Sequence, residues 1–199
     1  VVRPCLRGQV HVVRYADDIV LVFSDEHDAR RVLDVLPKRF GKYGLRLHPD
    51  KTKLVDFRRP PYDPRNGGGL GPTQTRSFSL LGFTHYWGRS RKGSWVIKRK
   101  TAKDRLRRAL RRVWVWCRYH RHAPVAEQHQ TLGKVLKGHY AYFGITGNVW
   151  SLASFYLRVG HTWRYWLNRR SQKAPMGWER FGRLEKRYPL PRPRIVHAI

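Results

Sequence analysis

Two adjacent carboxylates, Asp17 and Asp18, are the residues whose types and spacing best suit catalysis. They lie between two apolar runs, residues 10–13 and 19–23, whose β-branched residues predict two short, largely buried strands joined by a turn over residues 15–18. Neighbouring carboxylates repel each other, a penalty that a bound divalent cation removes. Mg²⁺ is typically held by one or two carboxylates and substrate phosphates, and two such ions stabilise the attacking and leaving oxygens of a phosphoryl transfer. An ordinary surface turn, in which Asp is also common, is the alternative interpretation.

The charge of the chain indicates a polyanionic partner. Lys and Arg number 42 against 13 Asp and Glu in 199 residues, so the formal net charge is +29. Residues 1–97 carry 18 basic and 9 acidic side chains, whereas residues 98–199 carry 24 and 4. Nucleic acid is the usual partner of so basic a chain, and we expect the second half to bind it. The 8 Trp, 10 Tyr and 8 Phe offer stacking surfaces for unpaired bases, although core packing is the simpler role for most of them.

Composition also narrows the class of protein. Hydrophobic residues make up 41% of the chain, enough for a packed core in one or two domains. Because Cys5 and Cys117 are the only cysteines, we expect no disulfide framework and a reducing, cytoplasmic environment. The sequence has no run of 18 apolar residues and no recognisable signal peptide, so no membrane span is expected. Since the Asp pair lies so near the start and no Met begins the chain, we expect a late part of a longer protein.

The first half predicts mixed structure around the Asp pair. A helix capped by Ser24 or Asp25 and stopped at Gly44 follows the second strand, and Pro37 should kink it or end it early. Its apolar stripe consists of Ala29, Val32, Leu33, Leu36 and Phe40.

Further strands and a loop complete the first half. Residues 45–57 predict two short strands around a Pro-Asp turn, and residues 58–75 a flexible loop. Residues 77–87 predict one strand, which returns at residues 95–97 after a turn.

The second half predicts three antiparallel helices, the first of which starts at Lys98 with Thr101 as its cap. Its apolar stripe is Leu106, Ala109, Leu110, Val113, Trp114 and Cys117. Its other face carries Lys103, Arg105, Arg107, Arg108, Arg111 and Arg112. With almost no acids to pair with them, phosphate contact is favoured over a merely solvated face. The Pro-rich residues 171–199 predict a basic, extended arm.

Four stretches resemble one enzyme family in the expected order. Tyr15-Ala16-Asp17-Asp18 between apolar strands resembles the catalytic hairpin of reverse transcriptases, in the form typical of enzymes encoded by group II introns. Pro49-Asp50-Lys51-Thr52 is similar to the segment that follows that hairpin, with Asp where Glu is commoner. Phe-Ser-Leu-Leu-Gly-Phe at residues 78–83 resembles the primer-grip hairpin. Lys-Gly-His-Tyr-Ala-Tyr-Phe at residues 137–143 resembles the signature of the maturase-specific domain, with Lys for Arg and His for Trp.

The resemblance implies an α+β fold with three parts. Residues 1–97 would be the C-terminal part of a polymerase palm with β-hairpins and a helix, and residues 98–170 an all-α three-helix thumb and maturase bundle. Residues 171–199 would be the basic tail, and because no paired-Cys motif is present, we expect none of the zinc-containing nuclease found in longer family members.

The family also implies an activity: an RNA-directed DNA polymerase, a nucleotidyltransferase, that doubles as an intron maturase. Its partners would be group II intron RNA, an RNA template, a DNA primer and deoxynucleoside triphosphates, with Mg²⁺ as cofactor. Asp17 and Asp18 would be the catalytic metal ligands, and Lys51 would help to protonate the pyrophosphate leaving group, unless it is simply an exposed turn lysine. Tyr15, Ala16, Leu81, Gly82 and Phe83 would lie beside nucleotide and primer. The residues expected to bind RNA are Lys103, Arg107, Arg108, Arg111, Arg112, Lys134, Lys137 and Arg164.

One component of the family is not found in this sequence. Family members bring a further Asp from an earlier palm strand, and neither that strand nor the fingers precedes Val10. We therefore expect this polypeptide alone to polymerise poorly or not at all, with the missing fingers and palm portion as a partner.

Three other interpretations stay open. A non-enzymatic RNA-binding splicing factor could keep the hairpin as a vestige. A basic, aromatic protein could lie on anionic membranes through the Trp-rich residues 149–167. Cys117, His120 and His122 are near enough in sequence to hold zinc, although a fourth ligand is missing. No phosphate-binding Gly-rich loop and no Ser/His/Asp signature is evident.

Overall fold

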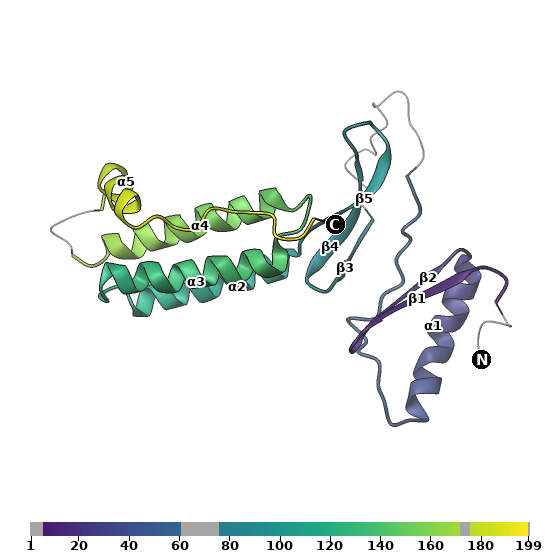
Figure 1. Cartoon of the computed structure of the whole chain (residues 1–199). Helices are drawn as coiled ribbons and strands as arrows, with labels where there is room; N and C mark the ends of the chain where they lie inside the picture. Colours follow the sequence, from purple (N-terminus) through teal and green to yellow (C-terminus); the bar gives the residue numbers. More distant parts are fainter. Residues whose placement is uncertain (1–5, 61–75, 172–175, 199) are drawn as a thin grey trace. The chain divides into compact units, whose positions relative to one another are not determined.

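The computed structural model describes residues 6–60, 76–171 and 176–198 (Figure 1). The chain divides into two compact units, Val1–Leu81 and Gly82–Ile199. The fold is α+β, with two small antiparallel sheets and five helices, as the sequence predicted. Most of the loop predicted at residues 58–75 lies outside the described residues.

The Asp17–Asp18 turn of the first unit is a two-residue loop. Strands β1 (Val10–Tyr15) and β2 (Asp18–Phe23) pair antiparallel with Tyr15 opposite Asp18, so only Ala16 and Asp17 connect them. Ala16 adopts a φ of +50°, and its carbonyl oxygen accepts a hydrogen bond of 3.1 Å from Arg14 Nε. The predicted hairpin is therefore confirmed.

The expected burial of this hairpin is wrong. Val12, Val13, Ile19 and Val22 are all exposed, Val12 by 57%. Packing from a single helix, α1 against β2, covers only part of a two-stranded sheet, which accounts for these apolar side chains facing solvent.

Helix α1 (Glu26–Gly41) begins where the sequence predicted. Asp25 is its N-cap and accepts a hydrogen bond of 2.9 Å from the backbone N–H of Asp28. The helix runs past Pro37, so the expectation of an early end is wrong. Proline removes one backbone hydrogen bond, and the predicted apolar stripe, partly buried along the helix, holds the last turn in place. Gly44, at a φ of +70°, follows the end of the helix.

The buried carboxylate of Asp28 fixes the chain leading into β1. Its Oδ2 accepts hydrogen bonds of 2.8 Å from the backbone N–H groups of both Arg7 and Gly8. The hydroxyl oxygen of Ser24 accepts a further bond of 2.8 Å from the backbone N–H of Gln9. Side chains at the start of α1 thus hold the start of the hairpin.

Residues 45–57 contain no strand, so the two strands predicted there are wrong. The turn between them does form, because the backbone N–H groups of Lys51 and Thr52 donate to the carbonyl oxygen of His48 at 3.2 and 3.0 Å. Leu45 and Leu54 are exposed, and no neighbouring strand pairs with this segment among the described residues. An extended segment needs such a neighbour to become a ladder.

The segment is nevertheless held at its end. Asp56 forms ion pairs with Arg58 and Arg76, and the ring of Phe57 meets that of Phe78 edge to face at 4.9 Å. Phe78 belongs to strand β3 (Ser77–Leu80), which closes the first unit.

The strand predicted over residues 77–87 is interrupted at Leu81 and Gly82, whose φ values are +51° and +78°. Strand β4 (Phe83–Arg89) follows and pairs antiparallel with β5 (Trp95–Thr101), with Phe83 opposite Thr101. β5 is longer than predicted, because residues 98–101 continue the strand instead of opening a helix. Ala102, not Thr101, is the N-cap of α2.

Three long helices, α2 (Lys103–Tyr119), α3 (Val125–Phe143) and α4 (Val149–Asn168), lie side by side in the second unit (Figure 1). The bundle agrees with the sequence prediction. Trp114 of the apolar stripe predicted for the first of these helices is exposed, whereas Phe155 of α4 is fully buried. The buried core consists of Val113, Cys117, Leu132, Leu136, Tyr140, Leu152, Phe155, Val159, Trp163, Leu167, Phe181 and Leu190.

The end of the chain belongs to this core. Helix α5 (Trp178–Arg187), which the sequence analysis did not predict, buries Phe181. The extended segment after it runs along the bundle (Figure 1), with Leu190 buried and the carbonyl oxygen of Pro191 accepting a hydrogen bond of 3.1 Å from the Tyr140 hydroxyl. A bridge between Ile145 and His197 completes this strap, residues 188–198. The predicted arm is extended at its end, but it is packed.

A buried polar contact joins β5 to the connection between α3 and α4. Asn148 Oδ1 accepts a hydrogen bond of 2.9 Å from the backbone N–H of Thr101. Asn148 Nδ2 donates to Thr101 Oγ1 and to the carbonyl oxygen of Phe143, both at 2.8 Å. Thr101 and Asn148 are both buried, so water cannot satisfy their polar groups, and these hydrogen bonds do so instead.

Asn148→Ala should destabilise the second unit. The substitution removes the Asn148 partner of both the buried Thr101 N–H and the Thr101 hydroxyl, and we expect a loss of about 2–3 kcal/mol. Urea unfolding followed by tryptophan fluorescence measures the change. The control is Val149→Ala at the exposed neighbouring position, expected within about 0.5 kcal/mol of wild type. Equal midpoints for the two variants would contradict a stabilising role for Asn148.

Candidate catalytic turn and nucleic-acid interface

Asp17 and Asp18 present two adjacent carboxylates at the tip of the hairpin, and both residues are exposed. Among the described residues, neither carboxylate is engaged in an ion pair or hydrogen bond. Tyr15, opposite Asp18 in the register, is 65% exposed. The turn therefore offers oxygen ligands that are free to bind a cation, with the exposed ring of Tyr15 at the end of the preceding strand.

The donor set at the turn fits a hard divalent cation in part. Oxygen ligands are those Mg²⁺ prefers, and Mg²⁺ sites commonly take their remaining ligands from water and substrate phosphates. Within residues 6–60, 76–171 and 176–198, no third carboxylate or imidazole joins Asp17 and Asp18 to form a cluster.

A different group of potential ligands, Asp25, His27 and Asp28, lies at the start of α1. Asp25 already caps the helix, and Asp28 already binds the Arg7 and Gly8 backbone. A helix N-terminus also carries partial positive charge, which disfavours a cation. These contacts give the group a structural role.

Lys51 lies in the turn over residues 49–51, and the residue is exposed. The neighbouring Thr52 hydroxyl donates to the carbonyl oxygen of His48 at 3.0 Å, which fixes the backbone there. The participation of Lys51 in catalysis stays a prediction.

The primer-grip motif and the maturase-like signature meet in the second unit. The ring of Phe83 is stacked on Tyr142 at 6.0 Å and meets Phe143 edge to face at 5.3 Å. The carbonyl oxygen of Gly82 accepts a hydrogen bond of 2.9 Å from the backbone N–H of Ala102. A Cβ on Gly82 would lie 3.4 Å from the Phe143 ring. Two motifs separated by about sixty residues therefore form one packed cluster.

Gly82→Ala and Gly138→Ala should change stability in opposite directions. Gly82 combines a φ of +78° with the close Phe143 ring, so Ala there should cost about 1–2 kcal/mol. Gly138 lies within α3 with open space around its Cβ position, so Ala there should stabilise by about 0.5–1 kcal/mol. Thermal unfolding of both variants measures the difference. Two shifts of the same sign would contradict this account of Gly82.

His139, which replaces Trp in the signature, is packed as an aromatic ring. It is 8% exposed and stacks on Phe155 with a centroid distance of 3.9 Å. Burial lowers the pKa of His139 to about 4, because the charged imidazolium would lose its hydration. The neutral ring therefore fills the place of a larger aromatic side chain.

Acidification should destabilise the second unit through His139. In the unfolded chain the imidazole regains an ordinary pKa near 6.5, so between pH 6.5 and 4 the unfolded state binds more protons than the folded state. Stability contributed by neutral His139 is thus complete above about pH 6.5 and falls as the pH drops toward 4, by up to about 3 kcal/mol. Urea unfolding at pH 7 and pH 4.5 measures this loss. His139→Phe should remove most of it, and an unchanged pH dependence in that variant would contradict the assignment.

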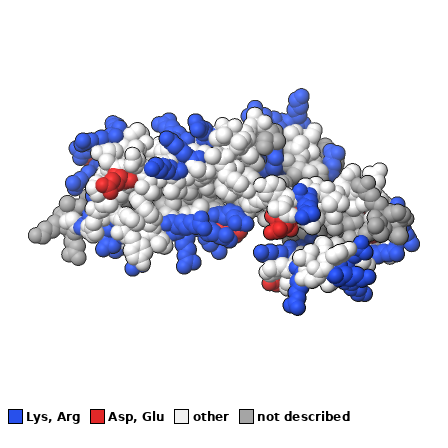
Figure 2. Space-filling view, turned by 60° about the horizontal axis from the view of Figure 1, so that its bottom comes forward, with Lys and Arg blue, Asp and Glu red and all other residues white. Residues whose placement is uncertain are grey.

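The outer face of α2 is strongly basic. Lys103, Arg107, Arg108, Arg111 and Arg112 are all exposed. Asp104 is the only acid in the helix, and its carboxylate lies 3.6 Å from Arg105 and 3.9 Å from Arg108. Figure 2 shows Lys and Arg spread over much of the visible surface, with few acidic side chains among them. This face keeps most of its positive charge uncompensated.

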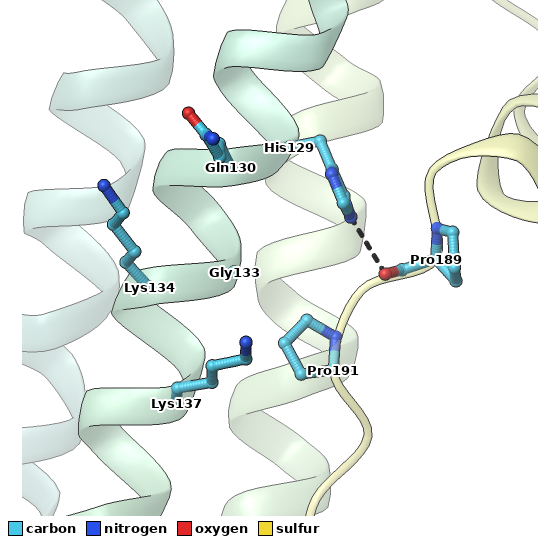
Figure 3. A pocket seen from close by; sticks show the side chains of 7 residues that line it. All are labelled: His129, Gln130, Gly133, Lys134, Lys137, Pro189 and Pro191. Carbon is cyan, nitrogen blue, oxygen red and sulfur yellow. Dashed lines mark hydrogen bonds between the residues drawn. The ribbon is translucent and has the colours of Figure 1, made fainter.

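Lys134 and Lys137 line a hollow of about 290 Å³ between α3 and the strap. Figure 3 shows both side chains leaving the same helix, with Lys137 on the side of Pro191. His129 Nε2 lies 2.9 Å from the carbonyl oxygen of Pro189 and fixes the strap at this place. Lys134 and Lys137 of α3 thus lie beside the strap, whose Pro189 and Pro191 line the other side of the hollow.

Arg164 differs from the other basic residues predicted to bind RNA. Its guanidinium donates to the carbonyl oxygen of Met176 at 2.9 Å and lies 3.8 Å from the centre of the Trp178 ring. These contacts join α4 to α5. A contact between Arg164 and RNA stays a prediction that these observations do not support.

The zinc interpretation of Cys117, His120 and His122 gains no support from the described residues. Cys117 is buried in the bundle core, and burial raises the pKa of its thiol to about 12, which disfavours the thiolate that binds metal. His120 Nδ1 lies 2.9 Å from the carbonyl oxygen of Trp116. These three residues form no ligand cluster in the described part of the chain.

A comparison with protein families finds a match to the first part of the chain. Residues 1–85 match the family model described as Reverse transcriptase (RNA-dependent DNA polymerase). The matched range includes β1, β2, α1 and β3, and hence the Asp17–Asp18 turn, Lys51 and the Leu81–Phe83 stretch. The reverse transcriptase match supports an RNA-directed DNA polymerase, a nucleotidyltransferase. No curated protein matches the chain.

The sequence analysis missed one surface feature near the basic residues. Val115, Trp116, Tyr119 and His120 line a second hollow, together with Arg108, Arg111 and Arg112. The spacing of these residues along one helix is visible in the sequence. Their exposure depends on which face α2 buries against α4, and that face was predicted only approximately.

Proposed function

We propose that this chain is the C-terminal part of a group II intron reverse transcriptase that also acts as a maturase. It would copy RNA into DNA and bind intron RNA to aid splicing. The observation that carries the proposal is the Asp17–Asp18 turn, exposed and unpaired within the range that matches reverse transcriptases. The basic second unit supplies the surface for nucleic acid.

The proposed chemistry is attack of a primer 3′-hydroxyl on the α-phosphate of a deoxynucleoside triphosphate. Asp17 and Asp18 would hold Mg²⁺, which when bound stabilises negative charge on the reacting phosphate. Tyr15 and Ala16 shape the turn, since the positive φ of Ala16 and its bond to Arg14 fix where the carboxylates point. Lys51 would supply a proton to the pyrophosphate leaving group.

The proposed grip on intron RNA rests on charge. Residues 98–199 carry 24 basic and 4 acidic side chains. Each Lys or Arg that meets a phosphate releases a condensed counterion, so binding should weaken steeply with salt. Lys103, Arg107 and Arg112 on α2, with Lys134 and Lys137 on α3, are the proposed contacts.

The polymerase would need a further palm surface. The apolar side chains of β1 and β2 are exposed on the described hairpin, and a third carboxylate is absent from its tip in the described part of the chain. A fingers and palm portion would bury Val12 and Val13 and would add the Asp that supplies the third carboxylate. We therefore propose that the 199 residues alone polymerise poorly.

The second candidate is an RNA-binding splicing factor with a vestigial hairpin, favoured by the same incomplete ligand set. The membrane-surface interpretation is weaker, because Leu152, Trp163 and Leu167 of the Trp-rich helix are buried in the bundle core. Within the described residues, no helix has the length and apolar character needed to cross a bilayer.

Asp17→Ala should abolish DNA synthesis and leave RNA binding intact. The assay is primer extension on an RNA template with Mg²⁺, by the chain joined to a reverse transcriptase fingers and palm portion. Loss of a metal ligand should lower the rate at least about 1,000-fold, since the metal-stabilised charge is lost from the transition state. Affinity for intron RNA, measured by filter binding, should change less than about twofold.

The matched control is Asp34→Ala, which removes an exposed acid from α1 in the same unit. It should extend primers at the wild-type rate. Unimpaired synthesis by Asp17→Ala would refute the catalytic assignment. RNA binding and splicing without any synthesis in the completed protein would favour the vestigial hairpin.

A further inference from the structure

The hollow at the end of α2 is built from cations and aromatic rings on one helix face. Arg108, Arg112, Val115 and Tyr119 recur at intervals of three or four residues, and Arg111 lies three residues after Arg108, which places them on a common side of the helix. With Trp116 and His120 they line a hollow of about 420 Å³. None of these aromatic residues belongs to the motifs that suggested the polymerase.

Two of the three arginines of this hollow, Arg111 and Arg112, lack anionic partners in the described part of the chain. Arg111 and Arg112 form no ion pair there, and the nearest acid to Arg108 is exposed Asp104, at 3.9 Å. Three guanidinium groups on adjacent turns thus produce a local positive potential. Such a potential attracts phosphate groups.

The aromatic part of the hollow is unusual for a phosphate site. Tyr119 is 75% exposed, and Val115 beside it is also exposed. Trp116 and His120 stack face to face, with ring centroids 4.6 Å apart and an interplanar angle of 12°. Phosphate alone needs no aromatic surface, whereas an unpaired base stacks on one.

The end of α2 is held rigid by bonds from inside the bundle. The side-chain amide of buried Gln128 donates to the carbonyl oxygens of His120 at 2.7 Å and Ala123 at 3.0 Å. Gln128 in turn accepts a bond of 2.9 Å from Trp163 Nε1. Arg170 also donates to the carbonyls of Arg121 and Ala123. Because this end is already ordered, a ligand that binds here loses little free energy to ordering it.

We propose that this hollow binds a single-stranded segment of RNA, with an unpaired base stacked on Tyr119 and neighbouring phosphates on Arg111 and Arg112. The inference rests on the proposed function, and it specifies the form of RNA that this face selects. The seven steps along the helix from Arg112 to Tyr119 span about 10 Å. About three bases stacked at roughly 3.4 Å cover that length. A duplex would offer the arginines its phosphates and keep its bases away from Tyr119.

The test compares binding of an unstructured 12-nucleotide RNA and a 12-base-pair RNA duplex to the full chain by fluorescence anisotropy at one salt concentration. Tyr119→Ala should weaken single-strand binding about tenfold and leave duplex binding within about twofold. Tyr119→Phe, which keeps the ring, should bind the single strand within about twofold of wild type. Trp150→Ala, which removes another exposed aromatic residue on α4, should change neither affinity.

Arg111→Ala with Arg112→Ala should weaken both single-strand and duplex binding and lower the salt slope by about two. A single strand carrying 5-iodouridine should crosslink to wild-type protein at Tyr119, as located by mass spectrometry. Wild-type single-strand affinity in Tyr119→Ala, or crosslinks only elsewhere, would overturn the inference while leaving RNA binding in place.

Two outcomes concern other partners. Failure of the wild-type chain to bind any RNA would refute the RNA-binding part of the proposed function together with this inference. Tyr119-dependent binding of anionic lipid vesicles without binding of RNA would assign the face to a membrane and overturn the inference as well.

Discussion

The surplus of positive charge in the second unit is the constraint on which its surface depends. A bundle that keeps arginines on adjacent turns of α2, with one acid among them, maintains electrostatic repulsion that a phosphate-bearing ligand relieves. The ion pairs of Asp104 and Glu179 in this unit are exposed and contribute little, so the interior must stabilise the unit. It does so with a dense apolar core and a few fully buried hydrogen bonds, of which those of Asn148 and Gln128 connect segments far apart in sequence.

The two faces of α2 differ in character, because one packs into the core and the other carries exposed basic and aromatic side chains. The inner face of α2 gives Val113 and Cys117 to the core, while its outer face gives Arg108, Arg111 and Tyr119 to solvent. Phe83, Phe143 and His139 form an aromatic cluster. Contacts between these rings pack the start of β4 against the end of α3. His139 can serve there only as a neutral ring, which makes the unit sensitive to acid.

The first unit has the opposite character. Its hairpin is well specified by sequence and by local bonds, including those of Asp28 and Arg14, yet much of its apolar surface is exposed. Two exposed carboxylates lie at a two-residue turn, within the range that matches the reverse transcriptase family model. A catalytic site built from several strands needs the residues of every strand. A well-formed hairpin is therefore not sufficient for catalysis.

The sequence by itself determined the local elements and predicted a polyanionic partner from the net charge of +29. Alternating and helical apolar spacing gave the Asp17–Asp18 hairpin, α1 and the three-helix bundle, because these patterns depend on periodicity alone. Tertiary structure decided what depends on neighbours. Residues 45–57 form no strands because no strand pairs with them, the Leu81–Gly82 turn divides one predicted strand, and residues 98–101 extend β5. Part of the predicted tail forms α5, Arg164 packs on Trp178, and Tyr119 is exposed. The sequence could not predict these outcomes, because burial depends on how the helices assemble into one core.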